Sequence, residues 1–215
     1  MGESERTASR LELVGGRLCL DFANTVSTRV EALRREYLTG YGELVRWSQH
    51  AGILEEDKAG VLLGEGTRQP EAAMAVLGRA ITLRETLYRI FGAVSDTREP
   101  DGEDLASMNA VLHDALSRLE VSPVAGGFNW TWTAGSDELD RMLWPIVRSA
   151  ADLLTSEDLG KVSQCARQGC DWLFLDLSKN RSRRWCSMEM CGSRIKSRRY
   201  YYRKKEEKVQ HSAAQ

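Results

Sequence analysis

The sequence predicts an α+β protein with a mostly helical N-terminal domain, a small antiparallel sheet in that domain, and a compact C-terminal module. Apolar residues recur at helical spacing in several long segments, whereas residues 128–133 alternate between aromatic and polar side chains. Four of the five cysteines fall within 27 residues near the C-terminal end. We expect an N-terminal domain over 1–158, a cysteine-bearing module over 159–207 and a disordered tail over 208–215.

Residues 11–22 predict a β-hairpin near the N-terminus. Two short strand-like runs flank Gly15-Gly16, and a glycine pair tolerates the positive φ angles of a tight turn. In the second run, apolar residues alternate at period two, which is typical of a strand. We expect strand 128–133 to pair with this hairpin and to close the N-terminal domain.

Helical periodicity predicts the elements that follow the hairpin. Short helices are expected over 43–50 and over 55–63, the second ended by the turn Gly64-Glu-Gly66. The clearest helix begins near Pro70, a favourable residue for a first turn. It is apolar on two sides, so it should be central.

Two further helices are expected, each with one apolar side. The first carries apolar residues from Leu105 to Leu119, and the second is capped by Ser136 and carries apolar residues from Leu139 to Leu153. Pro145 lies inside the second and should kink or interrupt it. This helix leads to Cys165 without an obvious flexible linker, so the C-terminal module should pack on the helical body.

The composition indicates where in the cell the chain is located. With 42% hydrophobic residues, the 215 residues can bury a sizeable core. The first residues are polar and no run of about 18 apolar residues occurs, so we expect neither a signal peptide nor a membrane span. An odd number of cysteines also favours a cytoplasmic location, where thiols stay reduced.

Charge divides the chain in two. Residues 1–164 carry 17 Lys and Arg against 26 Asp and Glu, whereas residues 165–215 carry 13 against 5. A basic segment on an acidic body predicts a polyanionic partner. The alternative is that the two parts simply attract each other.

The cysteines form two matched pairs. Cys165 and Cys170 make one C-x4-C pair, and Cys186 and Cys191 make another after fifteen residues. Four thiolates close a tetrahedron around one structural Zn²⁺ and leave no position for water or substrate. The alternatives are buried structural cysteines or two disulfides.

The residues around the pairs predict a small zinc-finger fold. Residues 172–177 and 182–185 are expected to form a hairpin between the two cysteine pairs. Ser187 should then cap a helix that carries Cys191 on its first turn. A knuckle, a hairpin and a ligand-bearing helix follow in the order of a treble-clef zinc finger.

A basic surface is expected beside the metal. Tyrosines interleave with arginines on the predicted helix, a combination that suits phosphate contacts and base stacking. DNA is the expected partner, with RNA, a protein–protein contact or a merely solvated basic helix as alternatives. The expected nucleic-acid contacts are Lys179, Arg181, Arg183, Arg184, Arg194, Lys196, Arg198, Arg199 and Arg203.

These residues resemble a known family. The runs Cys170-Asp-Trp-Leu-Phe-Leu-Asp, Ser-Arg-Arg-Trp-Cys186-Ser-Met and Cys191-Gly-Ser-Arg-Ile-Lys are similar to the bacterial CGNR zinc finger. Ser193 stands where that family has Asn, which spares the metal ligands. The runs 17–25 and 143–150 resemble the ABATE domain that precedes this finger. The resemblance implies a stress-related transcription regulator that binds DNA.

The N-terminal domain offers one candidate small-molecule site. Asp21, Asn24 and Thr25 could line an effector pocket with Arg148, although caps and a buried ion pair are the favoured explanation of these residues. The sequence contains no nucleophile–base pair, so we expect a regulator with a sensor or assembly domain and no enzyme. Because one finger has a short footprint on DNA, a homodimer is also expected.

Overall fold

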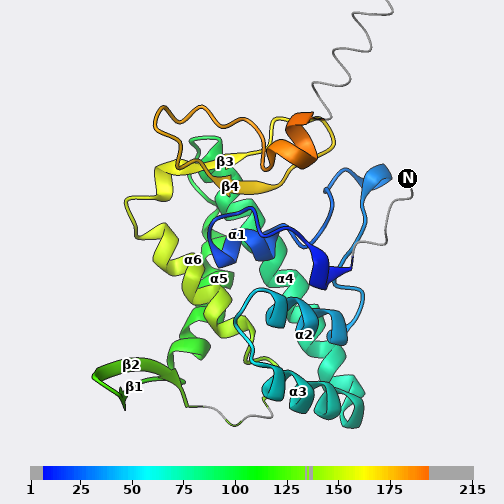
Figure 1. The fold of residues 1–215 in the computed structure, drawn as a ribbon, viewed down its shortest axis with the longest axis vertical. Coiled ribbons are helices and arrows are strands. Elements are labelled where there is room, and N and C mark those ends of the chain that lie inside the picture. Colours follow the sequence, from blue (N-terminus) through cyan, green and yellow to red (C-terminus); the bar gives the residue numbers. More distant parts are fainter. Residues whose placement is uncertain (1–6, 134, 136–137, 194–215) are drawn as a thin grey trace, which may run out of the picture.

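The computed structural model describes residues 7–133, 135 and 138–193. Helix α4 (Pro70–Ser95) forms the centre of the molecule. Both predicted apolar sides of α4 are used, since Leu77 and Phe91 on one and Leu83 and Leu87 on the other are buried, and the other helices lie around them (Figure 1). These helices are α1 (Leu18–Ala23), α2 (Tyr41–His50), α3 (Glu56–Arg68), α5 (Gly102–Leu116) and α6 (Leu143–Leu154).

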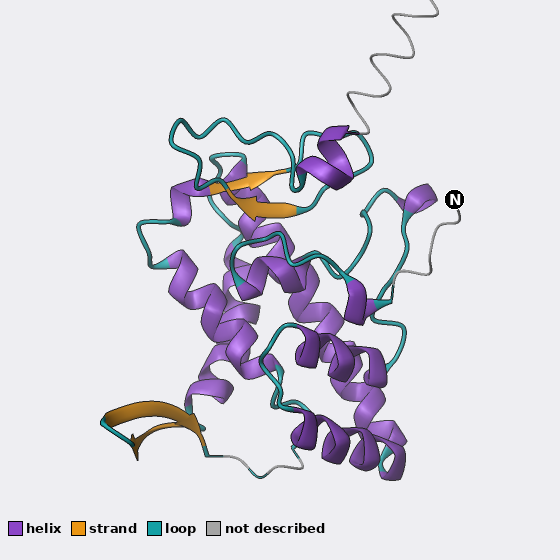
Figure 2. Ribbon diagram, viewed as in Figure 1, coloured by secondary structure: helices purple, strands orange, loops and turns teal. Residues whose placement is uncertain are grey.

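Two small antiparallel sheets lie at opposite ends of the molecule (Figure 2). Strands β1 (Leu119–Val124) and β2 (Gly127–Trp132) form a hairpin, which we call the outer hairpin. Strands β3 (Val162–Gln164) and β4 (Leu173–Leu175) form the second sheet, at the end that carries the cysteines. The predicted class, a mostly helical protein with small antiparallel sheets, is confirmed. Short 3₁₀ turns cover Ala8–Arg10, Glu31–Leu33 and Leu159–Lys161.

The predicted N-terminal hairpin is wrong, because Leu18–Ala23 forms helix α1. Cys19, Leu20 and Phe22 are all fully buried, so both sides of this short segment are apolar and its periodicity does not distinguish a strand from a helix. Gly16 does adopt a positive φ of 76°, but the two glycines lie in the loop before α1 and not in a hairpin turn. A Cβ on Gly15 would lie 2.8 Å from the Asp21 nitrogen, so glycine permits the close approach of this loop to α1.

The predicted partner of strand 128–133 is also wrong. The strand exists as β2, but it pairs with the adjacent β1 in the register Val121 to Trp130 and Pro123 to Phe128. Its aromatic side is mostly exposed, with Phe128 at 77% and Trp130 at 55% exposure. The outer hairpin therefore extends from the body instead of closing its core (Figure 1).

Two helix boundaries differ from the predictions for identifiable reasons. Helix α3 continues through Gly64 and Gly66 to Arg68, and Gly66 serves packing instead of ending the helix: a Cβ there would lie 2.7 Å from the Tyr41 ring. Helix α6 begins at Leu143, which places Pro145 in its first turn, where a missing N–H costs nothing. Among the described residues, no helix is both long and apolar enough to cross a membrane.

Candidate metal centre

The four predicted ligands converge. The Sγ atoms of Cys165, Cys170, Cys186 and Cys191 all lie within 4.8 Å of one another, and all four residues are buried. The Sγ of Cys186 lies 3.8 Å from that of Cys170 and 3.5 Å from that of Cys191. Zn–S bonds of about 2.3 Å give a tetrahedron with S–S edges of about 3.8 Å, so the spacing fits zinc. All five cysteines are free thiols, and the disulfide alternative is not observed.

The first cysteine pair lies on the turn that joins β3 to β4. The Cys165 N–H donates to the Trp172 carbonyl at 2.9 Å, and the Cys170 N–H donates to the Arg167 carbonyl at 2.9 Å. Gly169 has a φ of 76°, a left-handed conformation that favours glycine. The run Cys-Ala-Arg-Gln-Gly-Cys thus folds into a tight knuckle that directs both sulfurs to one point.

The second pair is held by a loop and a helical turn. The Ser187 side chain accepts a hydrogen bond from the Met190 N–H, which confirms the predicted cap. A π-helical turn, Met188–Gly192, then carries Cys191 back to the cluster. This turn positions the fourth ligand, as the sequence predicted. The continuation of the predicted helix lies outside the described residues.

The hairpin expected between the two cysteine pairs does not form. Residues 173–175 pair with β3, which precedes Cys165, and residues 178–184 form a loop with Arg181 at a φ of 46°. The buried apolar run Leu173–Leu175 finds its partner in Val162–Gln164, since both strands face the helical body. The expected treble-clef order is therefore not confirmed by the described residues, although the ligand set is unchanged.

Without a metal, four adjacent thiols cannot all ionise. Hydrogen bonds from the other three thiols lower the pKa of Cys165, whereas the contact with Cys165 raises the pKa values of Cys170 and Cys186. A divalent cation resolves this conflict because it stabilises all four thiolates. Arg167 supports the same charge state, since its Nε donates to the Cys191 Sγ at 3.1 Å. This role was not predicted from the sequence, although the position of Arg167 between two ligands could have indicated it.

The loop 178–184, which we call the basic loop, carries four of the predicted nucleic-acid contacts. Lys179, Arg181, Arg183 and Arg184 are all exposed on it. The Arg184 carbonyl accepts from the Ala166 N–H at 2.8 Å, which ties the basic loop to the knuckle. The predicted contacts Arg194, Lys196, Arg198, Arg199 and Arg203 lie outside the described residues.

Arg183, the fourth, has a structural role that the sequence did not reveal. Its guanidinium donates to the carbonyls of Trp185 at 3.0 Å and Leu175 at 3.2 Å, and also to those of Val14 and Cys186. Its Cζ lies 4.3 Å from the centre of the Phe174 ring. Arg183 therefore holds the basic loop against β4 and the body.

The C-terminal module is fixed to the helical body, as expected from the absence of a linker. The Asn24 amide makes two bonds to Leu173, accepting from its N–H at 2.9 Å and donating to its carbonyl at 2.8 Å. The indole of Trp172 donates to the Val26 carbonyl at 2.7 Å. Asp171, next to Cys170, accepts from the Arg29 N–H at 2.5 Å. The loop after α1 thus holds β4, the strand that follows Cys170, through these hydrogen bonds.

The other predicted effector residues are each committed to a separate contact. Asp21 accepts from the Gly15 N–H at 2.7 Å, and the Thr25 hydroxyl donates to the Phe22 carbonyl at 2.8 Å. Arg148 lies 5.2 Å from the Trp130 ring and 3.9 Å from Asp152.

A buried cluster of ion pairs lies next to the loop after α1, which holds β4. Arg84 is completely buried and contacts Glu36 at 2.6 Å and Glu85 at 2.8 Å. Burial opposes ionisation of Glu36, but hydrogen bonds and charge from Arg84 outweigh it and hold the pKa of Glu36 below its ordinary value. Arg29 joins the cluster through Glu85 at 2.7 Å and stacks 3.4 Å over Tyr88. The cluster therefore fixes the loop that holds the zinc module.

A closed four-cysteine centre on a helical body defines a protein with a structural zinc finger, with one zinc ion per chain. Family comparisons agree: the model for the CGNR zinc finger matches residues 161–204. The model for ABATE, described as "putative stress-induced transcription regulator", matches residues 16–157. The chain belongs to the ABATE family, with a CGNR zinc finger at its C-terminal end. No curated protein matches the chain.

Proposed function

We propose that the chain is a cytoplasmic transcription regulator whose zinc finger contacts DNA while its helical body senses a signal or assembles copies. The observation that carries this proposal is the position of the basic loop. Lys179, Arg181 and Arg184 are exposed beside a closed metal centre, which has no open position for catalysis. A rigid cationic surface of this kind suits a phosphate backbone.

The distribution of charge supports the same partner. The acidic body would repel a polyanion, so binding would concentrate on the finger and on the basic residues that follow it. Salt dependence should be strong, because each neutralised phosphate releases condensed counterions. Because a single finger covers a short footprint, we expect a homodimer in which the finger of each copy contacts one half of a two-part DNA site.

Duplex DNA binding to the intact chain tests this proposal by fluorescence anisotropy at several salt concentrations. Arg181→Ala with Arg184→Ala should weaken binding and lower the magnitude of the salt slope by about 2, one unit for each lost phosphate contact. The matched control is Arg46→Ala with Arg98→Ala, which removes two exposed arginines from the body. An equal loss of binding in both double variants contradicts the proposed surface.

Zinc dependence is tested separately with Cys170→Ser, which removes one ligand. This variant should lose both zinc and DNA binding, since the knuckle needs four thiolates to hold its geometry. Full DNA affinity in this variant refutes the zinc-dependent model. Stronger competition by structured RNA than by duplex DNA would move the proposal to RNA.

A further inference from the structure

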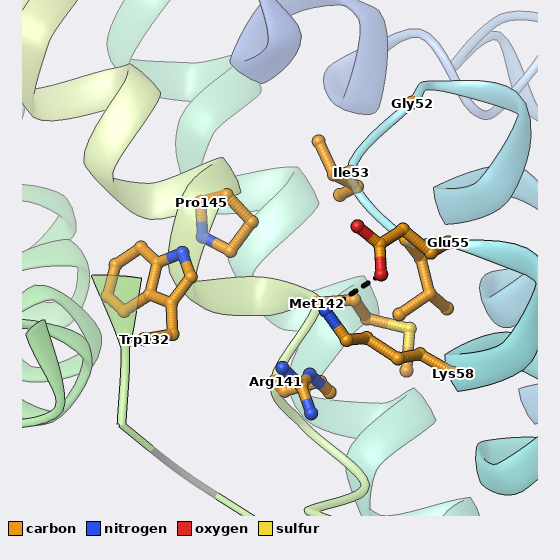
Figure 3. Close-up of a pocket in the computed structure, with 9 residues that line it drawn as sticks. Gly52, Ile53, Glu55, Lys58, Trp132, Arg141, Met142 and Pro145 are labelled. Atoms are coloured by element: carbon orange, nitrogen blue, oxygen red, sulfur yellow. Dashed lines mark ion pairs between the residues drawn. The ribbon is translucent and has the colours of Figure 1, made fainter. Parts of the chain in front are cut away.

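A cavity of about 200 Å³ lies on the helical body, on elements that do not belong to the zinc finger (Figure 3). It is open to solvent and is bordered by the loop before α3, the first turn of α3, the end of β2 and the start of α6. Figure 3 shows Trp132 on one side, the ion pair of Glu55 and Lys58 on the other, and Pro145 between them. The lining residues are Gly52, Ile53, Leu54, Glu55, Lys58, Trp132, Arg141, Met142 and Pro145.

The wall of the cavity favours a flat apolar group. Trp132 presents an indole ring, and Ile53, Met142 and Pro145 supply aliphatic and thioether surface around it. Aromatic rings stack favourably on such a surface. A cavity of about 150 Å³ accommodates benzene, so this one has room for a single ring with one small substituent.

The charges at the cavity favour an anionic substituent. Arg141 is half-buried, and its Nη1 donates to the Gly135 carbonyl at 3.1 Å, which uses one of five donors. Lys58 lies 3.0 Å from Glu55, which partly balances its charge. Arg141 therefore contributes most of the positive charge, and its planar fork matches a carboxylate.

We propose that this cavity binds a small organic anion composed of one ring and one carboxylate. The ring lies against Trp132 between Pro145 and Met142, and the carboxylate accepts hydrogen bonds from Arg141 with support from Lys58. Such a ligand would connect α3, α6 and the root of the outer hairpin, which gives the body a sensor site. The proposal does not depend on nucleic-acid binding.

Benzoate is a suitable probe, with benzamide as its neutral isostere. Isothermal titration or protein-detected NMR on the zinc-loaded chain should give a dissociation constant for benzoate on the order of 1 mM or below. Benzamide should bind at least about tenfold more weakly, because it lacks the charge-assisted hydrogen bonds. Equal binding of the two probes overturns the anion assignment, and no benzoate binding at about 10 mM overturns the site.

Variants locate the binding. Arg141→Gln should weaken benzoate binding by about tenfold or more and leave benzamide unchanged, since only the anion uses the guanidinium. Arg46→Gln is the matched control, an exposed arginine on α2 outside the cavity, and should change neither. Ile53→Phe should fill the cavity and weaken both probes, with thermal unfolding used to verify its fold. Unchanged benzoate binding in Arg141→Gln or in folded Ile53→Phe overturns the proposal.

Discussion

Asp21 shows how a single buried carboxyl affects the stability of the whole fold. Burial raises the pKa of Asp21 from 3.8 to about 6, although the Gly15 N–H and the nearby His50 oppose this shift. The folded state therefore holds the proton more tightly than the unfolded chain. Between pH 4 and pH 6 this group makes the fold less stable as pH rises, which is opposite to the effect of a carboxyl paired with an arginine.

Asp21→Asn should remove this dependence. The amide Oδ1 can still accept from the Gly15 N–H, but no buried charge forms above pH 6. We expect the variant to gain about 3 kcal/mol in the free energy of unfolding at pH 7 and to be close to the natural chain near pH 4. Urea unfolding across this pH range measures the difference. The exposed Asp57→Asn is the control, and a constant gain at every pH would rule out titration of Asp21 as the cause.

At the scale of elements, the outer hairpin is the feature that most needs a partner. A two-stranded hairpin is only marginally stable in water unless it packs against something. Its outer part exposes Val121, Phe128 and Trp130, while Trp132 at its root packs 5.7 Å from Trp144. We propose a second copy of the chain as the partner, because the proposed DNA-binding function would need two fingers to extend a short footprint.

Phe128→Ser with Trp130→Ser should therefore yield monomers. The change removes the exposed apolar side of the outer hairpin without touching the core, so the fold should survive. Multi-angle light scattering on the natural chain and the variant, at the same concentration, measures the mass. The control is Asn129→Ser with Thr131→Ser on the polar side. A natural chain that is monomeric at about 100 μM, well above a micromolar dissociation constant, contradicts this assignment.

At the scale of the molecule, the zinc centre and the helical body are mechanically connected. Asn24 bonds to Leu173, Trp172 bonds to the Val26 carbonyl and Asp171 bonds to the Arg29 N–H, so the strand after Cys170 is held by the loop after α1. Binding free energies between coupled sites are reciprocal. Zinc should therefore stabilise the body, and the body should retain zinc in the finger.

Asn24→Ala tests this connection. Loss of two buried hydrogen bonds should cost about 2–3 kcal/mol, shared between the stability of the body and the retention of zinc. Release of zinc to a colorimetric chelator should become several-fold faster, while Asn109→Ala on the exposed side of α5 should have no effect. Far-UV circular dichroism before chelation verifies that the variant is folded. Unchanged zinc release in a destabilised but folded variant would show that the two parts are independent.

Sequence patterns predicted the features that depend on interactions between residues close together in the chain. The ligand set follows from the spacing of the two C-x4-C pairs, and the central helix follows from an apolar pattern longer than any strand. Ser187 caps the turn with Cys191 because a serine before a helical turn satisfies exposed N–H groups wherever it occurs.

The tertiary structure decided which segments pair and which polar side chains bond to other parts of the protein. Leu18–Ala23 is a helix because the body buries both of its sides, and β4 pairs with β3 because that arrangement places Leu173 against Asn24. Arg183 and Arg184 are adjacent, chemically identical and both exposed, yet the Arg183 guanidinium donates to four carbonyls, whereas Arg184 joins the knuckle through its backbone carbonyl. Such differences depend on long-range packing, which a one-dimensional pattern of residue types does not specify.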